Sequence, residues 1–539
     1  MPLIGLAVAS TTAPETTSIE PGATKVLLFI RSLSSTLDAA EPLAAANAAL
    51  ESAEKAGAAR LLAEHVAGWS AMWDEGTVEV EGDPELAAAI DGSLYSILSS
   101  ARADFPYGLS PGGLASDGYH GHVFWDQESW MWPPLNHLHP AIAGSLLSYR
   151  FAKTSLVDRR AAAAENARSY GLPGIMYPWE STLTGVPADT WQPFGPSGSS
   201  CETYEIHIGG DIAQALWRYH ASTGNTSWLC DGGGLETLRG IATYYSARVS
   251  AGAAAGTYEL RRVTGPDEQA PEVNNSCYVN SIASLTLRAA ANLSAVCGQP
   301  VPANWTLIAA ALSESMPFNA SGHFNLEYDG YRHGTQVKQA DTIMAFGYPL
   351  SEWRDALAPS EVDPVAILND LTYYEGVTNP GGPAMTWSLF SMGWLDRGGT
   401  DKALSLFRRG YANAQKPFQV WTEGADGTGC TTFLTGAGGF LQSVINGYLG
   451  VRLGSGSLRL RPVAPPGNAT RLAIRGLHWH GRRLRLETAA GGATLQLLSG
   501  APVLLRSSGS PDTMLAVGDP SHALPAPVHA EVHEPLPNA

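Results

Sequence analysis

The sequence predicts a mainly α-helical protein with a small antiparallel β domain near its C-terminal end. Between residues 83 and 450, apolar residues recur at helical spacing in about a dozen segments separated by loops rich in Gly, Pro and Trp. After residue 450 the segments become short, alternating and bounded by turns, which is typical of antiparallel strands. The number of helices, together with polar and aromatic residues that are confined to the loops between them, favours an arrangement of paired helices closed in a ring. A functional site would then lie at one end of the ring, formed by the connecting loops.

The individual elements follow from local periodicity and from Gly and Pro punctuation. Helices are predicted at 84–102, 140–154, 156–170, 211–223, 235–249, 279–296, 303–315, 364–374, 385–395, 402–414 and 438–449. Strands are predicted at 457–463, 471–481, 482–489 and 493–499. The last stretch, 509–539, is rich in Pro, His and Ala, so we expect it to be loosely ordered.

The N-terminal part has a different texture. Residues 24–32 (TKVLLFIRS) form a good strand pattern, but no neighbouring sequence could complete a sheet, and a lone strand is not stable. Residues 1–33 are therefore expected to be the remnant of a larger N-terminal β domain. Residues 34–80 are expected to form a helical linker that ends in a short strand (TVEVEG), followed by a helical domain over 81–450 and a C-terminal β domain with a loose tail over 451–539.

Composition excludes several classes of protein. The 539 residues are 44% apolar and only 15% charged, enough for two or three domains with a large core. The net charge of -17 argues against a nucleic acid partner. No apolar run approaches the length of about 20 residues that a membrane span needs. Six N-x-S/T sequons favour secretion, whereas the N-terminus lacks the basic region of a signal peptide, so cytoplasmic and secretory locations both remain open. The sequence carries no signal for an oligomeric state.

No metal or other cofactor is predicted. The five cysteines contain no CxxC pair, which argues against a zinc site and against a dense disulfide framework. The paired histidines lack a third ligand at readable spacing and are expected to be ordinary packing or polar residues: His120 and His122, His137 and His139, His478 and His480.

Three loops place acids among aromatic and glycine residues, a setting that suits a sugar site. Asp126 follows Trp125 in GYHGHVFWDQESWMWPP, Glu268 lies in TGPDEQAPEVNN, and Glu423 lies in VWTEGADGTGC. Glycosidic cleavage usually needs two carboxyl groups across the scissile bond, one protonated and one ionised. The alternatives without a catalytic role are that Asp126 caps a helix or forms an ion pair in the core, and that Glu268 and Glu423 are exposed acids in turns.

Further groups could fix the hydroxyls of a sugar. Lys338 and Gln339 in VKQADT are candidates for that role, although both could simply be solvated. Glu180 in PWEST and Glu205 in ETYEIH are rival acids with similar aromatic company. From the residues alone, the prediction is a polar, aromatic-rich site in a helical enzyme, one that acts on carbohydrate.

Five ordered segments carry a resemblance to glycoside hydrolase family 65. They are YHGHVFWDQESWMWP, TGPDEQAPEVNNSCYVN, VKQAD, GPAMTWS and PFQVWTEGADGTGCTTFLTGAGGFLQ, and the similarity runs from Val80 to Gly450. The resemblance implies an (α/α)6 barrel, a preceding β-sandwich joined to it by linker helices, and a small C-terminal antiparallel β domain. It implies that residues 1–33 are a truncated remnant of that sandwich.

The resemblance also implies roles for individual residues. Glu268 matches the proton donor of the family, and Glu423 matches the acid proposed as general base in its hydrolytic members. The pairs Trp125-Asp126 and Lys338-Gln339 match its sugar-binding positions. The implied function is an inverting α-glucosidase that releases a terminal α-linked glucose from a small carbohydrate or a glycoprotein glycan, such as a glucosyl-galactosyl-hydroxylysine unit.

Three alternatives remain. The family contains disaccharide phosphorylases, which need an anion-binding loop where this chain has TGAGGF and which lack an acid at the position of Glu423. It also contains acid trehalases, and here Gln269 and Ala270 depart from the Tyr-His pair of the glucosidases that the chain resembles. The third alternative is a non-catalytic carbohydrate-binding protein. Retention of both Glu268 and Glu423 argues against it, because binding alone requires no proton transfer.

Overall fold

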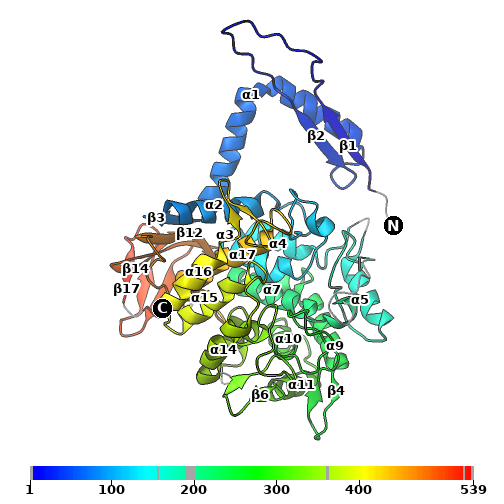
Figure 1. Ribbon diagram of the computed structural model, residues 1–539, viewed down its shortest axis with the longest axis vertical. Coiled ribbons are helices and arrows are strands. Elements are labelled where there is room, and N and C mark those ends of the chain that lie inside the picture. The colour runs from blue at the N-terminus through cyan, green and yellow to red at the C-terminus, as the bar shows by residue number, and fades with distance from the viewer. Residues whose placement is uncertain (1–3, 155–156, 189–200, 360–362, 526–527, 536–539) are drawn as a thin grey trace. The chain divides into compact units, whose positions relative to one another are not determined.

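The computed structural model describes residues 4–154, 157–188, 201–359, 363–525 and 528–535 (Figure 1). The chain separates into two compact units, Met1–Glu75 and Gly76–Ala539. The predicted helix at 156–170 begins at a residue outside the described ranges. None of the helices in these ranges combines the length and the apolarity that a membrane crossing requires.

The first unit is a β-hairpin packed on a helix. Strands β1 (Leu6–Ser10) and β2 (Arg31–Ser35) pair antiparallel, and both contact α1 (Pro42–Glu75). The strand predicted at 24–32 is wrong: only its last two residues belong to β2, and the apolar run before them is mostly exposed. Strand pairing requires a partner, and β1 takes up residues 31–35 instead.

The second unit contains most of the helices, as the sequence predicts. The helices, including the short 3-10 and π segments named η, are α2 (Pro84–Leu98), η1 (Gly118–Gly121), η2 (Gln127–Met131), α3 (Trp132–Leu138), α4 (Pro140–Ser148), α5 (Arg159–Ser169), α6 (Cys201–Tyr204), α7 (Ile208–Thr223), α8 (Thr226–Cys230), α9 (Gly234–Arg248), α10 (Cys277–Val296), α11 (Ala303–Glu314), α12 (Asp341–Phe346), α13 (Leu350–Leu357), α14 (Pro364–Val377), α15 (Thr386–Asp396), α16 (Thr400–Gly410), α17 (Leu434–Gln442) and η3 (Ser443–Tyr448).

Helix α10 lies at the centre of the helical part. It begins where the Ser276 side chain accepts a hydrogen bond from the backbone N–H of Val279, a standard N-cap. Fifteen of its twenty residues are buried, and it contacts α7, α9, α11, α12 and α13. Because α10 follows the loop that holds Glu268 directly, that loop is anchored to a long, largely buried helix.

Three short hairpins interrupt the helices: β4 (Ser250–Ala251) with β5 (Tyr258–Glu259), β6 (Phe318–Asn319) with β7 (Phe324–Asn325), and β8 (Ala414–Gln415) with β9 (Val420–Trp421). Glu423 lies two residues after β9. These hairpins lie in the loops between helices, and such loops can carry the polar side chains of a functional site.

The glycine-rich run TGAGGF is helical throughout, whereas the sequence predicts a helix only from residue 438. It forms the first turns of α17, and all residues of that helix are buried. A Cβ on Gly436 would lie 2.9 Å from Ala384 Cβ, a Cβ on Gly439 would lie 2.6 Å from Met385 Cβ, and one on Gly438 would overlap the Trp130 carbonyl. The glycines are therefore required for close packing of α17 against η2 and against residues 384–385.

The C-terminal part contains two five-stranded antiparallel sheets, as the short alternating segments predict. One has the order β17-β14-β13-β12-β3 and the other β10-β11-β18-β15-β16. The strands are β3 (Thr77–Glu81), β10 (Val451–Leu453), β11 (Ser457–Leu460), β12 (Arg471–Trp479), β13 (Arg482–Ala489), β14 (Gly492–Ser499), β15 (Val503–Ser507), β16 (Thr513–Leu515), β17 (His522–Leu524) and β18 (Ala530–His533).

The expectation that 509–539 is loosely ordered is wrong for its described part. Strand β18 lies in the middle of its sheet, between β11 and β15, and its Ala530 and Val532 are buried. The four residues of β18 are too few for the sequence pattern to distinguish a strand from a loop. They form a strand because β11 and β15 satisfy their backbone hydrogen bonds on both sides.

A disulfide joins Cys230, at the end of α8, to Cys297, directly after α10. Its Cα atoms lie 5.6 Å apart, within the range that a disulfide allows. The two cysteines are 67 residues apart in the chain, so their spacing in the sequence does not predict the bond. One disulfide agrees with the prediction that the protein has no dense disulfide framework. Of the remaining cysteines, Cys201 and Cys277 are buried and Cys430 is partly exposed.

Candidate active site

Glu268 lies in the loop that precedes α10. Backbone hydrogen bonds of 2.8 Å in both directions between Val263 and Val273 close the loop at its base. The Nζ of Lys338 donates a hydrogen bond to Glu268 Oε2. The Glu268 side chain is 26% exposed and that of Lys338 is 30% exposed, so a ligand from solvent can reach both groups.

Asp267 fixes the backbone on both sides of this ion pair. Its Oδ1 accepts hydrogen bonds from the backbone N–H of Lys338 at 3.1 Å and of Gln269 at 3.2 Å. Burial raises the pKa of Asp267 to about 6, although these two N–H donors oppose the rise. Gln339 is buried, and its Nε2 donates to the Pro266 carbonyl at 2.8 Å. In this structure Gln339 therefore holds the Glu268 loop in place rather than presenting its amide N–H groups to solvent.

Trp125 and Asp126 lie immediately before η2. Trp125 is buried and meets Trp130 edge-on, with ring centroids 5.7 Å apart. Asp126 Oδ1 accepts a hydrogen bond of 2.6 Å from the hydroxyl of Thr435 at the start of α17. Burial raises the pKa of Asp126 to about 6; the Thr435 hydrogen bond opposes this, and the charge of Glu268 adds to it.

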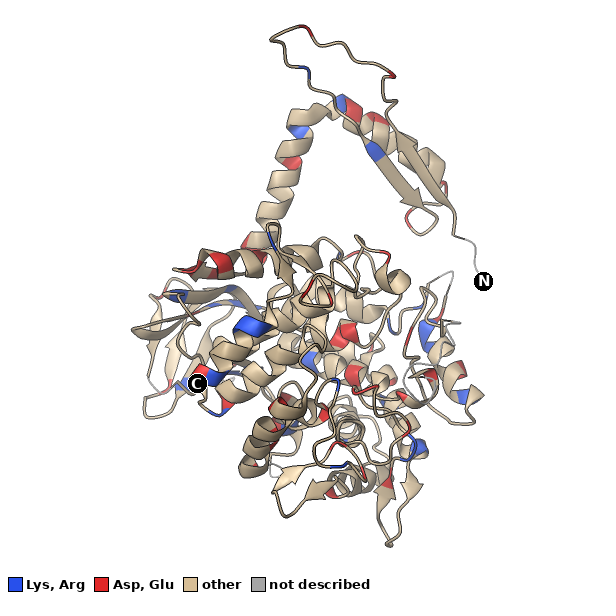
Figure 2. Cartoon of the chain, viewed as in Figure 1, with Lys and Arg blue, Asp and Glu red and all other residues tan. Residues whose placement is uncertain are grey.

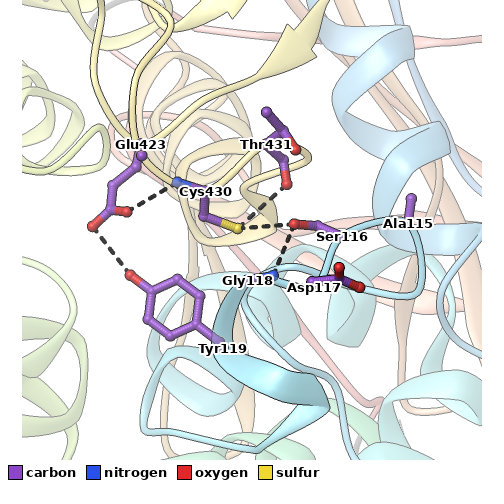
Figure 3. A pocket seen from close by; sticks show the side chains of 9 residues that line it. Ala115, Ser116, Asp117, Gly118, Tyr119, Glu423, Cys430 and Thr431 are labelled. Carbon is purple, nitrogen blue, oxygen red and sulfur yellow. Dashed lines mark hydrogen bonds between the residues drawn. The ribbon is translucent and has the colours of Figure 1, made fainter.

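Glu423 lies in a tight turn after β9, and both of its carboxylate oxygens accept hydrogen bonds. The hydroxyl of Tyr119 donates to Oε1 at 3.1 Å, and the backbone N–H of Cys430 donates to Oε2 at 3.3 Å (Figure 3). Gly429 has a φ of 78°, and a Cβ there would lie 2.7 Å from Glu423 Cβ and 2.8 Å from Oε2. The conformation of the Glu423 side chain therefore depends on glycine at position 429.

A cavity of about 680 Å³ opens beside Glu423. It is lined by residues 115–119 and 429–431 together with Glu423 (Figure 3). Tyr119 and His120 have φ values of 62° and 53°, and strained backbone of this kind is often found at functional sites. Burial, followed by the charge of Glu423, raises the pKa of the Tyr119 phenol, so it stays a hydrogen-bond donor to the carboxylate.

Lys338 links the two carboxyl groups electrostatically. Burial lowers the pKa of Lys338, but the charges of Glu268, Glu205 and Glu423 outweigh it and raise the pKa above the usual value. Glu268 and Glu423 come from loops 155 residues apart, and both act on the same ammonium group. Asp126 is affected in turn by the charges of Glu268 and Lys338. Three of the predicted acids, Asp126, Glu268 and Glu423, therefore interact electrostatically with Lys338, and Glu268 also accepts its hydrogen bond.

A buried ion cluster that the sequence reasoning missed supports Trp125. His207 packs edge-on against Trp125, with ring centroids 5.1 Å apart. Its Nδ1 lies 2.7 Å from Asp211 Oδ2, and Tyr278 donates its hydroxyl to Asp211 Oδ1 at 2.6 Å. Burial lowers the pKa of His207, but the Asp211 charge outweighs this and raises it to about 10. The i, i+4 spacing of His207 and Asp211 on one helix was the only signal in the sequence.

The rival acids have other partners. Glu180 lies 2.7 Å from His122 Nδ1, in an ion pair that is buried on the glutamate side. Glu205 is fully buried, and its Oε2 lies 3.5 Å from His207 Nε2. Glu205 acts on Lys338 and Glu268 only at a distance, through its charge. Neither acid combines the partial exposure of Glu268 and Glu423 with a contact to Lys338 or to the cavity beside Glu423.

A helical domain with two partly accessible carboxyl groups on separate loops, both of which interact with the same lysine, is compatible with a glycoside hydrolase. The chain belongs to glycoside hydrolase family 65. Residues 93–314 match the model of the glycosyl hydrolase family 65 central catalytic domain, and residues 451–511 match that of the glycosyl hydrolase family 65 C-terminal domain.

Relatives of known name support this assignment. The chain is 37% identical over 435 residues to protein-glucosylgalactosylhydroxylysine glucosidase of Danio rerio, covering 78% of this chain and 62% of the relative. It is 35% identical over 508 residues to the protein of the same name of Dictyostelium discoideum, covering 93% and 67%. The chain thus spans about three fifths to two thirds of the length of these relatives.

The fold also agrees with a solved structure. A putative kojibiose phosphorylase from human microbiome superposes with a TM-score of 0.73 at 14% identity, over 95% of this chain and 73% of that chain. At this identity the likeness shows the fold alone. It supports a mainly helical domain followed by a small antiparallel β domain.

Proposed function

We propose that the protein is an inverting α-glucosidase that hydrolyses a terminal α-linked glucose from a disaccharide or a glycoprotein glycan. The observation that carries the proposal is that two partly exposed carboxyl groups lie on separate loops, Glu268 in a hydrogen bond with Lys338 and Glu423 at the wall of a cavity, and that the charges of both act on Lys338. Two carboxyl groups on opposite sides of a sugar are what glycosidic cleavage requires. We further propose that the helices of residues 81–450 form an (α/α)6 barrel with this site at one end.

In the proposed mechanism Glu423 acts as general base. It takes a proton from a water molecule, which attacks the anomeric carbon on the face opposite the leaving group. Both carboxylate oxygens are already held, by Tyr119 and by the Cys430 N–H, so the carboxylate needs little reorganisation on binding water. The adjoining cavity supplies a route from solvent to this position.

Glu268 acts as general acid and donates its proton to the leaving oxygen. In the structure without substrate it is paired with Lys338. A glucose hydroxyl that accepts a hydrogen bond from Lys338 Nζ would displace the Glu268 carboxyl group from the lysine. Asp126 accepts hydrogen bonds from other hydroxyls of the same glucose, and the buried Trp125 holds the backbone next to Asp126 in place. An inverting enzyme needs the two carboxyl groups about 6.5–9.5 Å apart.

The phosphorylase alternative is less well supported. Its anion-binding loop would fall on residues 435–440, which in this chain form buried turns of α17. The run contains no Lys or Arg, and the Thr435 hydroxyl is already bonded to Asp126. Glu423 would place a negative charge against an incoming phosphate. Acid trehalase activity differs only in the aglycone, which Gln269 and Ala270 would face in the proposed arrangement.

The test is a panel of α-linked glucosides assayed for glucose release with and without phosphate. Kojibiose, trehalose, maltose and glucosyl-galactosyl-hydroxylysine distinguish the substrates. We expect glucose release that millimolar phosphate does not accelerate, with β-glucose as the first product by NMR. Accumulation of β-glucose 1-phosphate would establish the phosphorylase instead, and the absence of any turnover together with retained sugar binding would establish a carbohydrate-binding protein.

A further inference from the structure

Three arginines gather on one face of the sheet that contains β18. In the register of β11, β18 and β15, Arg459 pairs with Glu531, and Glu531 pairs with Arg506 on its other side. Residues directly opposite each other on neighbouring strands point to the same face. Arg459, Glu531 and Arg506 therefore form one row across three strands.

A second row lies one step further along the same face. Ala530 pairs with Leu460 on one side and Ser507 on the other, and the next residues outward are Arg461, His529 and Ser508. The backbone N–H of Ser508 donates to the His529 carbonyl at 3.3 Å, which continues the pairing beyond the strands. Because side chains alternate between faces, this row points to the same side as the first.

The two rows face outward and enclose a cavity. The intervening residues Leu460 and Ala530 are buried, whereas Arg461, Arg506 and His529 are exposed. The cavity has a volume of about 240 Å³, enough for a small anion or one charged group of a larger ligand, and the three arginines, Glu531, His529 and Ser508 all line it. Figure 2 shows that basic residues lie on the strands of the C-terminal part, in a protein whose net charge is -17.

The positive charge of the cavity is only partly neutralised. Arg459 Nη1 lies 3.2 Å from Asp355 Oδ2, and Arg506 Nε lies 3.1 Å from Asp512 Oδ2. Glu531 is itself within 3.1 Å of His533 Nε2. Arg461 has no acidic partner within the described ranges of the chain. The cavity is thus lined by three guanidinium groups and one carboxylate, with the fork of Arg461 available to a ligand.

We propose that this face binds a sulfate or phosphate monoester, either as the free anion or as an ester on a saccharide. A guanidinium group presents N–H donors in a planar fork that matches two oxygens of such an anion. A carboxylate can satisfy one fork, whereas a tetrahedral oxyanion carries three terminal oxygens as a monoester or four as the free anion and can accept from guanidinium groups on different strands. The hydroxyl of Ser508 supplies a further donor.

This site shares no residue with the Glu268 and Glu423 site, and it stands whether or not the protein hydrolyses glucosides. The experiment is isothermal titration of the full chain at low ionic strength with inorganic sulfate, inorganic phosphate, galactose 6-sulfate and unmodified galactose. We expect saturable binding of the sulfate or phosphate group and none of unmodified galactose. Binding of galactose 6-sulfate without binding of inorganic sulfate would identify the ester on a saccharide as the ligand.

The variant Arg461→Gln is expected to weaken binding about tenfold, the effect of losing a charge-assisted hydrogen-bond donor. Arg397→Gln is the matched control. Arg397 is also exposed, lies at the end of α15 and does not line the cavity, and its substitution removes the same charge. Thermal unfolding without ligand checks that both variants fold, and glucose release from a neutral disaccharide should be unchanged in Arg461→Gln. Absence of saturable binding by the wild-type protein, or equal weakening in the two variants, would overturn the proposal.

Discussion

The ammonium group of Lys338 donates a hydrogen bond to the carboxylate of Glu268, and the backbone N–H of the same lysine donates to Asp267. The side chain and the main chain of Lys338 thus hold two consecutive acids of one loop. A general acid must deliver its proton to the leaving oxygen, whereas in this structure the Glu268 carboxyl group is occupied by Lys338. The proposed mechanism therefore requires substrate to take over the Lys338 hydrogen bond, and this requirement can be tested.

Glu268→Gln should lower the turnover of natural glucosides by about 10²-fold or more, because an amide cannot protonate the leaving oxygen. The loss should be much smaller for a glucoside with an activated leaving group, which departs without a proton. The measurement is kcat/KM for both kinds of substrate. Glu272→Gln is the matched control, since Glu272 lies in the same loop but pairs with Arg262. An equal loss on both kinds of substrate would show that Glu268 is not the acid.

Glu423→Gln should lower hydrolysis by about 10²–10⁴-fold, because no other group at that position can accept the proton of the attacking water. The amide can keep the hydrogen bond from Tyr119, so the protein should fold and bind glucose as before. The measurement is single-turnover hydrolysis together with glucose affinity. Asp426→Asn, in the same turn and bonded to Thr428, is the control. Retention of most of the activity in Glu423→Gln would remove the general base from the mechanism.

Asp126 should make glucose binding depend on pH. Burial places its pKa at about 6, so the carboxylate is ionised above that pH and protonated below it. Protonation removes an acceptor for sugar hydroxyls, and KM should therefore rise as the pH falls through about 6. Asp126→Asn should bind glucose about tenfold more weakly than the wild-type protein at every pH, and its KM should not change as the pH passes through about 6. A KM profile that is the same in the variant and the wild-type protein would assign the step to another group.

Asp370 offers a test of pH-dependent stability away from the site. It accepts hydrogen bonds from the backbone and side-chain N–H groups of Asn325, both at 2.7 Å, and burial raises its pKa to about 7. The folded state then binds a proton between about pH 4 and pH 7 that the unfolded state has released, so the contribution of Asp370 to stability falls as the pH rises through this window.

Asp370→Asn cannot titrate and should lack this decline. The difference in the free energy of unfolding between the wild-type protein and Asp370→Asn should therefore shift in favour of the variant as the pH rises toward 7. Urea unfolding of both proteins across the window measures it. Comparing the two proteins cancels the contributions of the other titrating groups, and a constant difference would show that Asp370 titrates at its ordinary value.

The sequence determined the elements whose signal is local. Helical spacing located α2, α9, α10 and α11 to within a few residues at each end, and alternation located β12, β13 and β14. Acids in aromatic, glycine-rich loops indicated the candidate residues of the site. These signals suffice because periodicity and loop composition depend on residues within one turn or one strand.

Tertiary structure alone decided the features that depend on partners far away in the chain. Strand β18 exists because β11 and β15 flank it, and residues 24–29 are not a strand because β1 pairs with residues 31–35 instead. The disulfide between Cys230 and Cys297 and the start of α17 at Leu434, before the predicted start at residue 438, have the same origin.

The candidate site shows the same division. The sequence identified Glu268, Lys338 and Glu423 as candidates, but only the fold places Lys338 in hydrogen-bonding contact with Glu268 and gives Gln339 its bond to Pro266. The roles of Tyr119 and His207 depend on contacts with Glu423 and Trp125, residues 304 and 82 positions away. Such contacts have no local signature, because hydrogen bonding and ring packing depend on distance in space rather than on distance along the chain.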